Sequence, residues 1–209
     1  MLRRLFLSLA CFAAVMQPLA FVQAAEPALP AMSAEAAVKG YVDNLVTRIR
    51  EVKPLYASDR AAYLTAVGEA LTGFVDFNEV ARGVMAKYGN SATPEQMQRF
   101  AEVFKASLVD FYGSSLADYS AADYTIVAAT EVPENPVSAT PVKMDFKTAS
   151  GTLSVEYTMF VNVNSEWKLK NLFIDGINMR RQYYAQFDSM MLSNNNDIDK
   201  VIAQWAVGQ

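Results

Sequence analysis

The residue types that most often carry enzyme chemistry are scarce in this chain. Its 209 residues include no histidine and a single cysteine, Cys11. A chain without histidine has no Ser-His-Asp triad, no histidine metal ligand and no imidazole proton shuttle at neutral pH. Any catalysis would therefore depend on carboxylates, tyrosines or lysines.

Three carboxylates are the candidates for a general base, namely Asp145, Glu156 and Asp175. The first two alternate with apolar neighbours in strand-like runs, so both are expected to point away from an apolar interior. Asp175 stands next to Gly176 and is expected to cap the following helix. The acidic run at 194–199 lacks the glycine and the glutamate of a calcium-binding loop. We therefore expect no catalytic residue and no metal site.

The first 24 residues have the pattern of a secretory leader. Arg3 and Arg4 precede an uncharged apolar run over 5–16, and the segment ends in Val-Gln-Ala at Ala24. This order is typical of a signal peptide that is cleaved after the small residue. A membrane anchor is a weaker alternative, because a bilayer span needs about 20 apolar residues and a Gln-Pro pair interrupts this run. We expect an exported protein with a single domain over 25–209.

Removal of the leader changes the composition of the chain. The remainder has no cysteine, and therefore no disulfide and no thiolate ligand. Loss of two arginines from 18 basic residues leaves 16 against 22 acidic ones, a formal charge of −6. An acidic chain without basic runs is a poor partner for nucleic acid. Because 52% of the residues are apolar, the chain is long and hydrophobic enough to bury a core.

Four amphipathic helices are expected in the first half of the chain. Apolar residues recur there at intervals of three and four, after capping residues at Ser33, Ser58-Asp59 and Asp76. The third helix should end at Gly89-Asn90. The clearest start is Thr93-Pro94-Glu95-Gln96, where Thr is the N-cap, Pro the first helical residue and Gln the end of a capping box. A long stripe of aromatic and aliphatic residues follows it.

From Tyr124 the apolar period changes to two, which predicts β-strands. The runs lie at 124–131, 142–148, 152–163 and 166–174. Turn residues separate the last three, so these should form an antiparallel meander. The expected architecture is α+β, with helices packed on a curved antiparallel meander of about four strands, a cone-like arrangement of the nuclear-transport-factor type. Its parts are helices over about 33–120, the sheet over about 124–175 and C-terminal helices over about 177–207.

Several short segments, none decisive alone, carry a resemblance to a known family through their order and spacing. They are 75–88, beginning Val-Asp-Phe-Asn-Glu-Val-Ala-Arg, then Ala92–Gln96 with Arg99 and Phe100, the helical series Phe104, Leu108, Tyr112, Leu116 and Tyr119, then Trp167–Leu169, Asp175–Asn178, and Tyr183 with Gln186 and Phe187. Over the whole mature chain the sequence resembles the MlaC family, the periplasmic phospholipid-binding components of the Mla lipid-transport system, also known as toluene-tolerance auxiliary proteins.

The resemblance implies a carrier and not an enzyme. A protein of this family shuttles glycerophospholipid through the periplasm, between an outer-membrane lipoprotein–porin complex and an inner-membrane lipid ABC transporter complex, and so maintains the lipid asymmetry of the outer membrane. It implies no cofactor besides the lipid cargo. We expect a monomer that encloses an apolar cavity.

The cavity is expected between the apolar face of the meander and the helices, because an acyl chain needs an apolar site that the protein's own side chains leave unfilled. The residues predicted to line it are Phe74, Val80, Val84, Phe104, Leu108, Phe111, Tyr112, Met144, Phe146, Val155, Tyr157, Met159, Val161, Leu172, Ile174, Ile177 and Met179. Each of them is equally compatible with a packed core, since a stripe on a sheet face looks the same in both cases.

Four cations are candidates for contact with a lipid phosphate, namely Arg82, Lys87, Arg180 and Arg181. Solvation at the surface is the ordinary alternative for each. Two other functions stay open at the level of sequence. One is a cone-fold small-molecule-binding domain or isomerase-like enzyme with a buried carboxylate base, and the other is an interaction module with an exposed apolar patch in place of an internal void.

Overall fold

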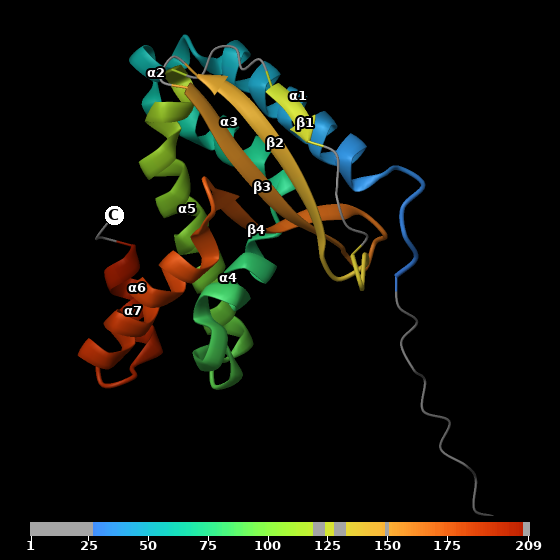
Figure 1. The fold of residues 1–209 in the computed structure, drawn as a ribbon. Coiled ribbons are helices and arrows are strands. Elements are labelled where there is room, and N and C mark those ends of the chain that lie inside the picture. The colour runs from blue at the N-terminus through green and yellow to red at the C-terminus, as the bar shows by residue number, and fades with distance from the viewer. Residues whose placement is uncertain (1–26, 119–123, 128–132, 149–150, 207–209) are drawn as a thin grey trace, which may run out of the picture.

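The computed structural model describes residues 27–118, 124–127, 133–148 and 151–206. In these residues an antiparallel sheet lies against helices (Figure 1). The elements are α1 (Ala34–Val52), α2 (Leu55–Ser58), α3 (Arg60–Phe74), α4 (Phe77–Met85), the 3₁₀ helix η1 (Ala86–Asn90), α5 (Pro94–Asp118), β1 (Tyr124–Val127), β2 (Thr140–Thr148), β3 (Gly151–Val161), β4 (Trp167–Ile174), β5 (Ile177–Asn178), α6 (Met179–Ser193) and α7 (Ile198–Trp205). No helix among the described residues is long and apolar enough to cross a membrane.

The predicted helix starts are confirmed by their capping hydrogen bonds. The side chains of Ser33, Asp59 and Asp76 each accept a bond from the backbone N–H three residues on, at 3.2, 3.0 and 2.9 Å. At α5 the capping box is complete, because the N–H of Gln96 donates to Thr93 Oγ1 at 3.2 Å and the N–H of Thr93 donates to Gln96 Oε1 at 3.0 Å. These side chains satisfy backbone donors that a helix start leaves unpaired.

The third helix ends earlier than its sequence indicates. α4 stops at Met85, and a 3₁₀ turn occupies 86–90 before α5 begins. The chain leaves the helix through Ala86, whose φ is +44°, a left-handed conformation that a non-glycine residue seldom adopts. The four-residue helix α2, directly after Pro54, is also absent from the sequence-based expectation. Both are short turns without an apolar period to reveal them.

The sheet is an antiparallel meander in the order β1-β2-β3-β4-β5. The predicted α+β class is therefore confirmed, with the two-residue strand β5 added to the four expected. Between β3 and β4 the register shifts at Thr158/Met159, since Thr158 pairs with Asn171 whereas Met159 pairs with Leu169. The extra residue in β4, Lys170, makes a β-bulge that turns the following side chains. The predicted leader and the predicted strand end at 128–131 lie outside the described residues.

Two sequence-based expectations at strand ends are wrong. The strand expected over 152–163 is too long, because β3 ends at Val161 and Val163 is 93% exposed. Asp175 does not cap the following helix. It lies in the turn after β4 with φ +47°, and its carboxylate accepts the N–H of Ser154 at 2.9 Å, while Asn178 caps α6.

The buried apolar residues form three separate clusters. The sheet cluster joins β2, β3 and β4 to the first turns of α1, and includes Ala34, Ala37, Val38, Met144, Met159 and Val161. The helical cluster joins α4, α5, α6 and α7, and includes Val84, Phe100, Phe104, Phe187 and Trp205. A smaller cluster joins the second half of α1 to α3, and includes Ile49, Tyr63 and Val67. Figure 1 shows α4, α6 and α7 around the first half of α5, away from the β1–β2 hairpin.

Aromatic contacts attach the C-terminal helix α7 to the rest of the helical cluster. The ring of Phe100 lies edge-to-face with Trp205 at 5.3 Å and with Phe187 at 4.9 Å between centroids. The Trp205 indole N–H donates to Ser107 Oγ at 3.1 Å. Edge-to-face pairs of this kind are favourable beyond the area that they bury.

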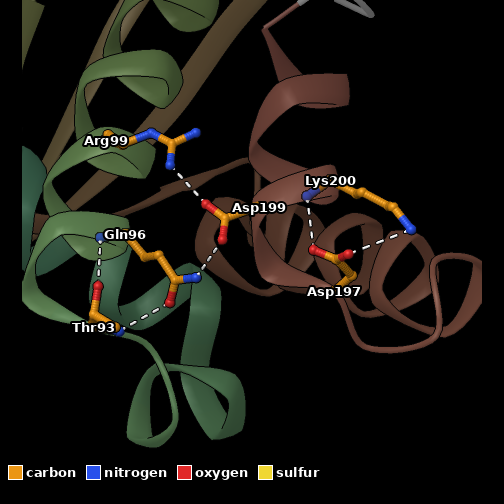
Figure 2. A network of polar contacts seen from close by, with 6 residues as sticks. All are labelled: Thr93, Gln96, Arg99, Asp197, Asp199 and Lys200. Atoms are coloured by element: carbon orange, nitrogen blue, oxygen red, sulfur yellow. Dashed lines mark hydrogen bonds and ion pairs between the residues drawn. The ribbon is translucent and has the colours of Figure 1, made fainter.

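A polar network on the surface joins the starts of α5 and α7 (Figure 2). Gln96 Nε2 and Arg99 both donate to the carboxylate of Asp199, at 2.8 and 2.6 Å. Both members of the Arg99–Asp199 pair are more than half exposed. Exposed ion pairs stabilise a fold by less than about 1 kcal/mol, so the aromatic cluster beneath is the main attachment of α7.

Substitution of neighbouring residues on α5 tests this division. We expect Phe100→Ala to lower the free energy of unfolding by about 3–5 kcal/mol, because it opens a cavity among buried rings. Arg99→Ala, one residue away and exposed, should cost less than about 1 kcal/mol. Urea unfolding measures both, and comparable losses for the two variants would contradict the assignment.

Candidate functional site

An apolar cavity lies between the sheet and the helices, with a volume of about 430 Å³. Most of its wall is aliphatic or aromatic. The lining residues are Val42, Leu45, Val46 and Ile49 of α1, Leu71, Phe74 and Val75 at the end of α3, Phe77 and Val80 of α4, Phe104, Leu108, Tyr112, Ser115 and Leu116 of α5, Phe146, Leu153, Val155, Tyr157, Leu169, Asn171, Leu172 and Ile174 of the sheet, and Met179, Arg180 and Tyr183 of α6.

The cavity lies where the three buried clusters meet. Phe74 and Val155 come from the sheet cluster, Phe104 from the helical cluster and Ile49 from the cluster of α1 and α3. Each cluster is packed within itself, and the space between them stays open. The wall includes the exposed Ser115, so the cavity borders the surface at that end.

The polar groups on this wall are few and belong mainly to α5 and α6. The hydroxyls of Tyr112 and Tyr183 lie 3.1 Å apart and share a hydrogen bond. The side-chain oxygen of Asn171, a buried residue, accepts the backbone N–H of Arg180 at 3.2 Å. Buried polar groups are costly without partners, and these pairings let an apolar cavity contain them.

Burial determines the acid–base behaviour of Tyr183. Desolvation raises the pKa of its phenol far above the ordinary value, and the hydrogen bond with Tyr112 raises it further. The hydroxyl therefore stays protonated and neutral at any physiological pH. The cavity consequently presents uncharged hydroxyls along α5 and α6.

Comparison with known proteins gives the family. The family model described as MlaC protein matches residues 39–207. The chain belongs to the MlaC family. A curated relative, the toluene tolerance protein ttg2D of Pseudomonas putida, is 36% identical over 171 residues, which cover 81% of this chain and 78% of the relative.

A solved structure shares the fold of this MlaC-family chain. It is the phospholipid-binding protein of Ralstonia solanacearum in complex with a phospholipid, with a TM-score of 0.72 and 21% identity. The match covers 84% of this chain and 99% of that one. At this identity the likeness establishes the common fold.

Many of the residues predicted to line a cavity do lie on this wall. The structure brings together Phe74, Val80, Phe104, Leu108, Tyr112, Phe146, Val155, Tyr157, Leu172, Ile174 and Met179. They come from α3, α4, α5, α6 and three strands. Contact of these residues with lipid remains a prediction.

Six of the predicted residues lie elsewhere. Phe111 on α5 is 62% exposed, and Ile177 is 51% exposed at the start of the short strand β5. The other four are buried in the clusters and not on the wall, namely Val84, Met144, Met159 and Val161. On the sheet, the small residues Ala34 and Ala37 of α1 belong to the same cluster and cover that region.

The helix α1 and several polar residues contribute to the wall although their sequence did not predict it. The lining residues outside the prediction are Val42, Leu45, Val46, Ile49, Leu71, Val75, Phe77, Ser115, Leu116, Leu153, Leu169, Asn171, Arg180 and Tyr183. The spacing of three and four along α1 was a signal for burial. It carried no information on whether a side chain or an empty space lay opposite.

The four candidate cations have different surroundings. Arg82 pairs with Glu79, and Lys87 pairs with Asp188 at 2.7 Å. Arg181 is exposed. Arg180 is the one charged residue on the cavity wall among the residues that the structure describes.

The candidate carboxylate bases do not belong to the cavity. Asp145, Glu156 and Asp175 are all absent from its wall. Asp145 lies on the outer face of β2, where its Oδ1 is buried without a hydrogen-bond partner among the described residues. Across those residues, no group of three or more acidic or cysteine side chains is placed to hold a metal ion. The site therefore offers shape and apolar surface, without an acid–base pair directed into it.

A second depression, of about 850 Å³, lies beside the cavity and shares Val75 and Phe77 with it. Its wall includes exposed polar residues of α4 and α5. Its two lysines already have partners, since Lys105 donates to Thr72 Oγ1 at 2.6 Å and Lys168 donates to the carbonyl of Gly73 at 2.8 Å. A polar, open wall of this kind does not suit an acyl chain, so the smaller apolar cavity is the candidate site.

Alkaline titration tests the burial of Tyr183. We expect the phenol of Tyr183 to ionise at a higher pH than an ordinary tyrosine. Tyr183→Phe should therefore remove tyrosinate absorbance only from the most alkaline part of the titration. Below about pH 10 the Tyr183 phenol is protonated in both the folded and the unfolded chain. Above about pH 10 the phenol of the unfolded chain loses its proton before that of the folded chain. The stability that Tyr183 contributes therefore declines with rising pH.

The matching stability measurement is urea unfolding at pH 8 and at pH 11. The decline between the two should be smaller for Tyr183→Phe than for the unsubstituted chain. Tyr56→Phe, which removes an exposed phenol, controls for the loss of one tyrosine. An equal decline with and without Tyr183 would contradict its burial.

Proposed function

We propose that this MlaC-family protein is a periplasmic phospholipid-binding carrier. The observation that carries the proposal is the apolar cavity of about 430 Å³ between sheet and helices. Ligand sites of proteins are typically concave, largely apolar and about 300–1,000 Å³ in volume. The relative from Ralstonia solanacearum that shares this fold is a phospholipid-binding protein, which supports the same class of ligand here.

The volume suits an acyl chain. A cavity of about 150 Å³ accommodates benzene, so by proportion about 430 Å³ holds roughly 17 carbon atoms. This is the length of one common acyl chain. Each methylene that leaves water contributes about 0.8 kcal/mol, so a chain of roughly 16 carbons contributes on the order of 12 kcal/mol.

The remaining parts of the proposal rest on the family. The protein shuttles glycerophospholipid between the outer-membrane lipoprotein–porin complex and the inner-membrane lipid ABC transporter complex, and so maintains outer-membrane lipid asymmetry. Export by the leader over 1–24 places it in the periplasm. It acts as a monomer and not as an enzyme, with the single domain over 25–209 carrying the lipid.

Bound lipid is the direct test. Protein purified from its native periplasm and extracted with organic solvent should release phospholipid in stoichiometric amount, as measured by mass spectrometry. The reason is that an acyl chain in the cavity would leave only slowly into water. Protein that is consistently free of lipid, and that takes none from phospholipid vesicles, would overturn the carrier function.

Filling the cavity from within should reduce lipid binding. We expect Val155→Trp to lower the amount of bound phospholipid about tenfold, because overpacking an occupied site costs about 1–3 kcal/mol. Val163→Trp makes the same substitution just beyond the same strand, at a position that is 93% exposed, and should leave lipid content unchanged. Circular dichroism checks that both variants fold. Equal lipid content in the two variants would place the ligand outside this cavity.

A further inference from the structure

Among the residues that the structure describes, the cavity wall has one charged side chain, and it is a cation. Among the described lining residues, Arg180 of α6 is accompanied by apolar and uncharged polar residues, without a carboxylate. No acidic group of the described chain lies within ion-pair distance of its guanidinium, although the other three candidate cations are either paired or fully outside the wall. A half-buried arginine at the edge of an apolar site selects for an anion on the ligand.

The position of Arg180 is determined by a glycine on the neighbouring helix. A Cβ atom at Gly83 of α4 would collide with Cδ of Arg180, and its Cγ and Nε are also within 3.5 Å of that point. The aliphatic part of the Arg180 side chain therefore packs directly against the backbone of α4 at Gly83, where there is no side chain to displace it. The backbone N–H of Arg180 is also held by Asn171 at 3.2 Å. Together these contacts hold the start of the side chain before any ligand arrives.

A second cation, Lys170 of β4, interacts electrostatically with Arg180 but lies outside the cavity wall. Burial lowers the pKa of the Lys170 amine; the Glu79 carboxylate opposes that shift, and the positive charge of Arg180 adds to it. Glu79, the acidic group in this surrounding, already pairs with Arg82. Lys170 donates to the carbonyl of Ser138 and Arg82 pairs with Glu79, so both of these cations have partners, and Arg180 is the cation left for an anion at the cavity wall.

We propose that Arg180, seated over Gly83, binds the phosphate group of a phospholipid whose acyl chain occupies the cavity. The guanidinium presents paired N–H donors that match two phosphate oxygens. Tyr183 lies one turn further along α6 on the same wall, where its shared hydroxyl pair with Tyr112 continues the polar side of the cavity. The acyl chain then lies toward α1, whose lining residues are all aliphatic. This inference rests on the proposed carrier function and adds the orientation of the lipid.

The test is a competition between two lipids that differ by the phosphate. Delipidated full-length mature protein is incubated with mixed vesicles of phosphatidylglycerol and diacylglycerol that have the same acyl chains, and the lipid that it takes up is measured by mass spectrometry. We expect phosphatidylglycerol to be enriched over diacylglycerol, and Arg180→Gln to reduce that enrichment about tenfold, the effect of losing a charge-assisted bond. Phosphatidylethanolamine in place of phosphatidylglycerol should give the same result, because the phosphate is common to both.

Two further variants separate a phosphate site from a general effect of charge. Arg181→Gln removes the same charge from the adjacent, exposed position and should keep the enrichment. Gly83→Ala keeps every charge but displaces the side chain of Arg180, so it should reduce the enrichment as Arg180→Gln does. It also tests the proposal if Arg180→Gln does not fold. Addition of a fatty acid to the vesicles shows whether Arg180 selects the carboxylate of a fatty acid or the phosphate of a phospholipid. Preference for fatty acid over phospholipid would overturn the proposal.

The outcomes for the inference and for the carrier function are distinct. Uptake of both lipids in the vesicle ratio, or an unchanged enrichment in Arg180→Gln, would overturn the role of Arg180 and leave the carrier function standing. Equal losses in Arg180→Gln and Arg181→Gln would also overturn it. Failure of the unsubstituted protein to take up any lipid would overturn both.

Discussion

The structure depends on an apolar core that its own side chains leave open at the centre. A void of about 430 Å³, if it stayed empty, would cost on the order of 10 kcal/mol at about 24 cal/mol per Å³. That is comparable with the whole stability of a typical domain, about 5–15 kcal/mol. An acyl chain of roughly 16 carbons offsets it with on the order of 12 kcal/mol. The cavity and an apolar ligand are therefore energetically matched.

The rest of the fold is arranged so that the walls are stable around this opening. The sheet cluster is covered by the first turns of α1 through Ala34, Ala37 and Val38, and the helical cluster is held by the rings around Phe100 and Trp205. Each of these clusters packs through contacts among its own residues. Polar groups enter the wall chiefly from α5 and α6, so the cavity has a polar side and a side, along α1, that is purely aliphatic.

Local features of this chain were predictable because their causes are local. The caps at Ser33, Asp59, Asp76 and Thr93 each satisfy backbone groups within three residues, so the sequence contains both partners. Strand alternation placed Val155 and Tyr157 on one face for the same kind of reason. The failures occur where a distant element decides. Phe111 continues the α5 stripe, yet it is 62% exposed, and Asp175 bonds to Ser154 across the sheet and not to the helix that follows it.

By itself the sequence determined the starts of α1, α3, α4 and α5, the antiparallel meander, the apolar faces and the membership of a family, since each of these depends on residue order and spacing. Only the tertiary structure decided which apolar residues line a void and which fill a core. Val38 and Val42 lie one turn apart on α1 and both belong to the sheet cluster, but Val42 also lines the cavity and Val38 does not. The same holds for charge, since Arg180 differs from Arg181 only by the direction in which it leaves α6. The tendency of a residue to be buried depends on its own side chain. Whether empty space lies opposite that side chain depends on how several elements pack around it.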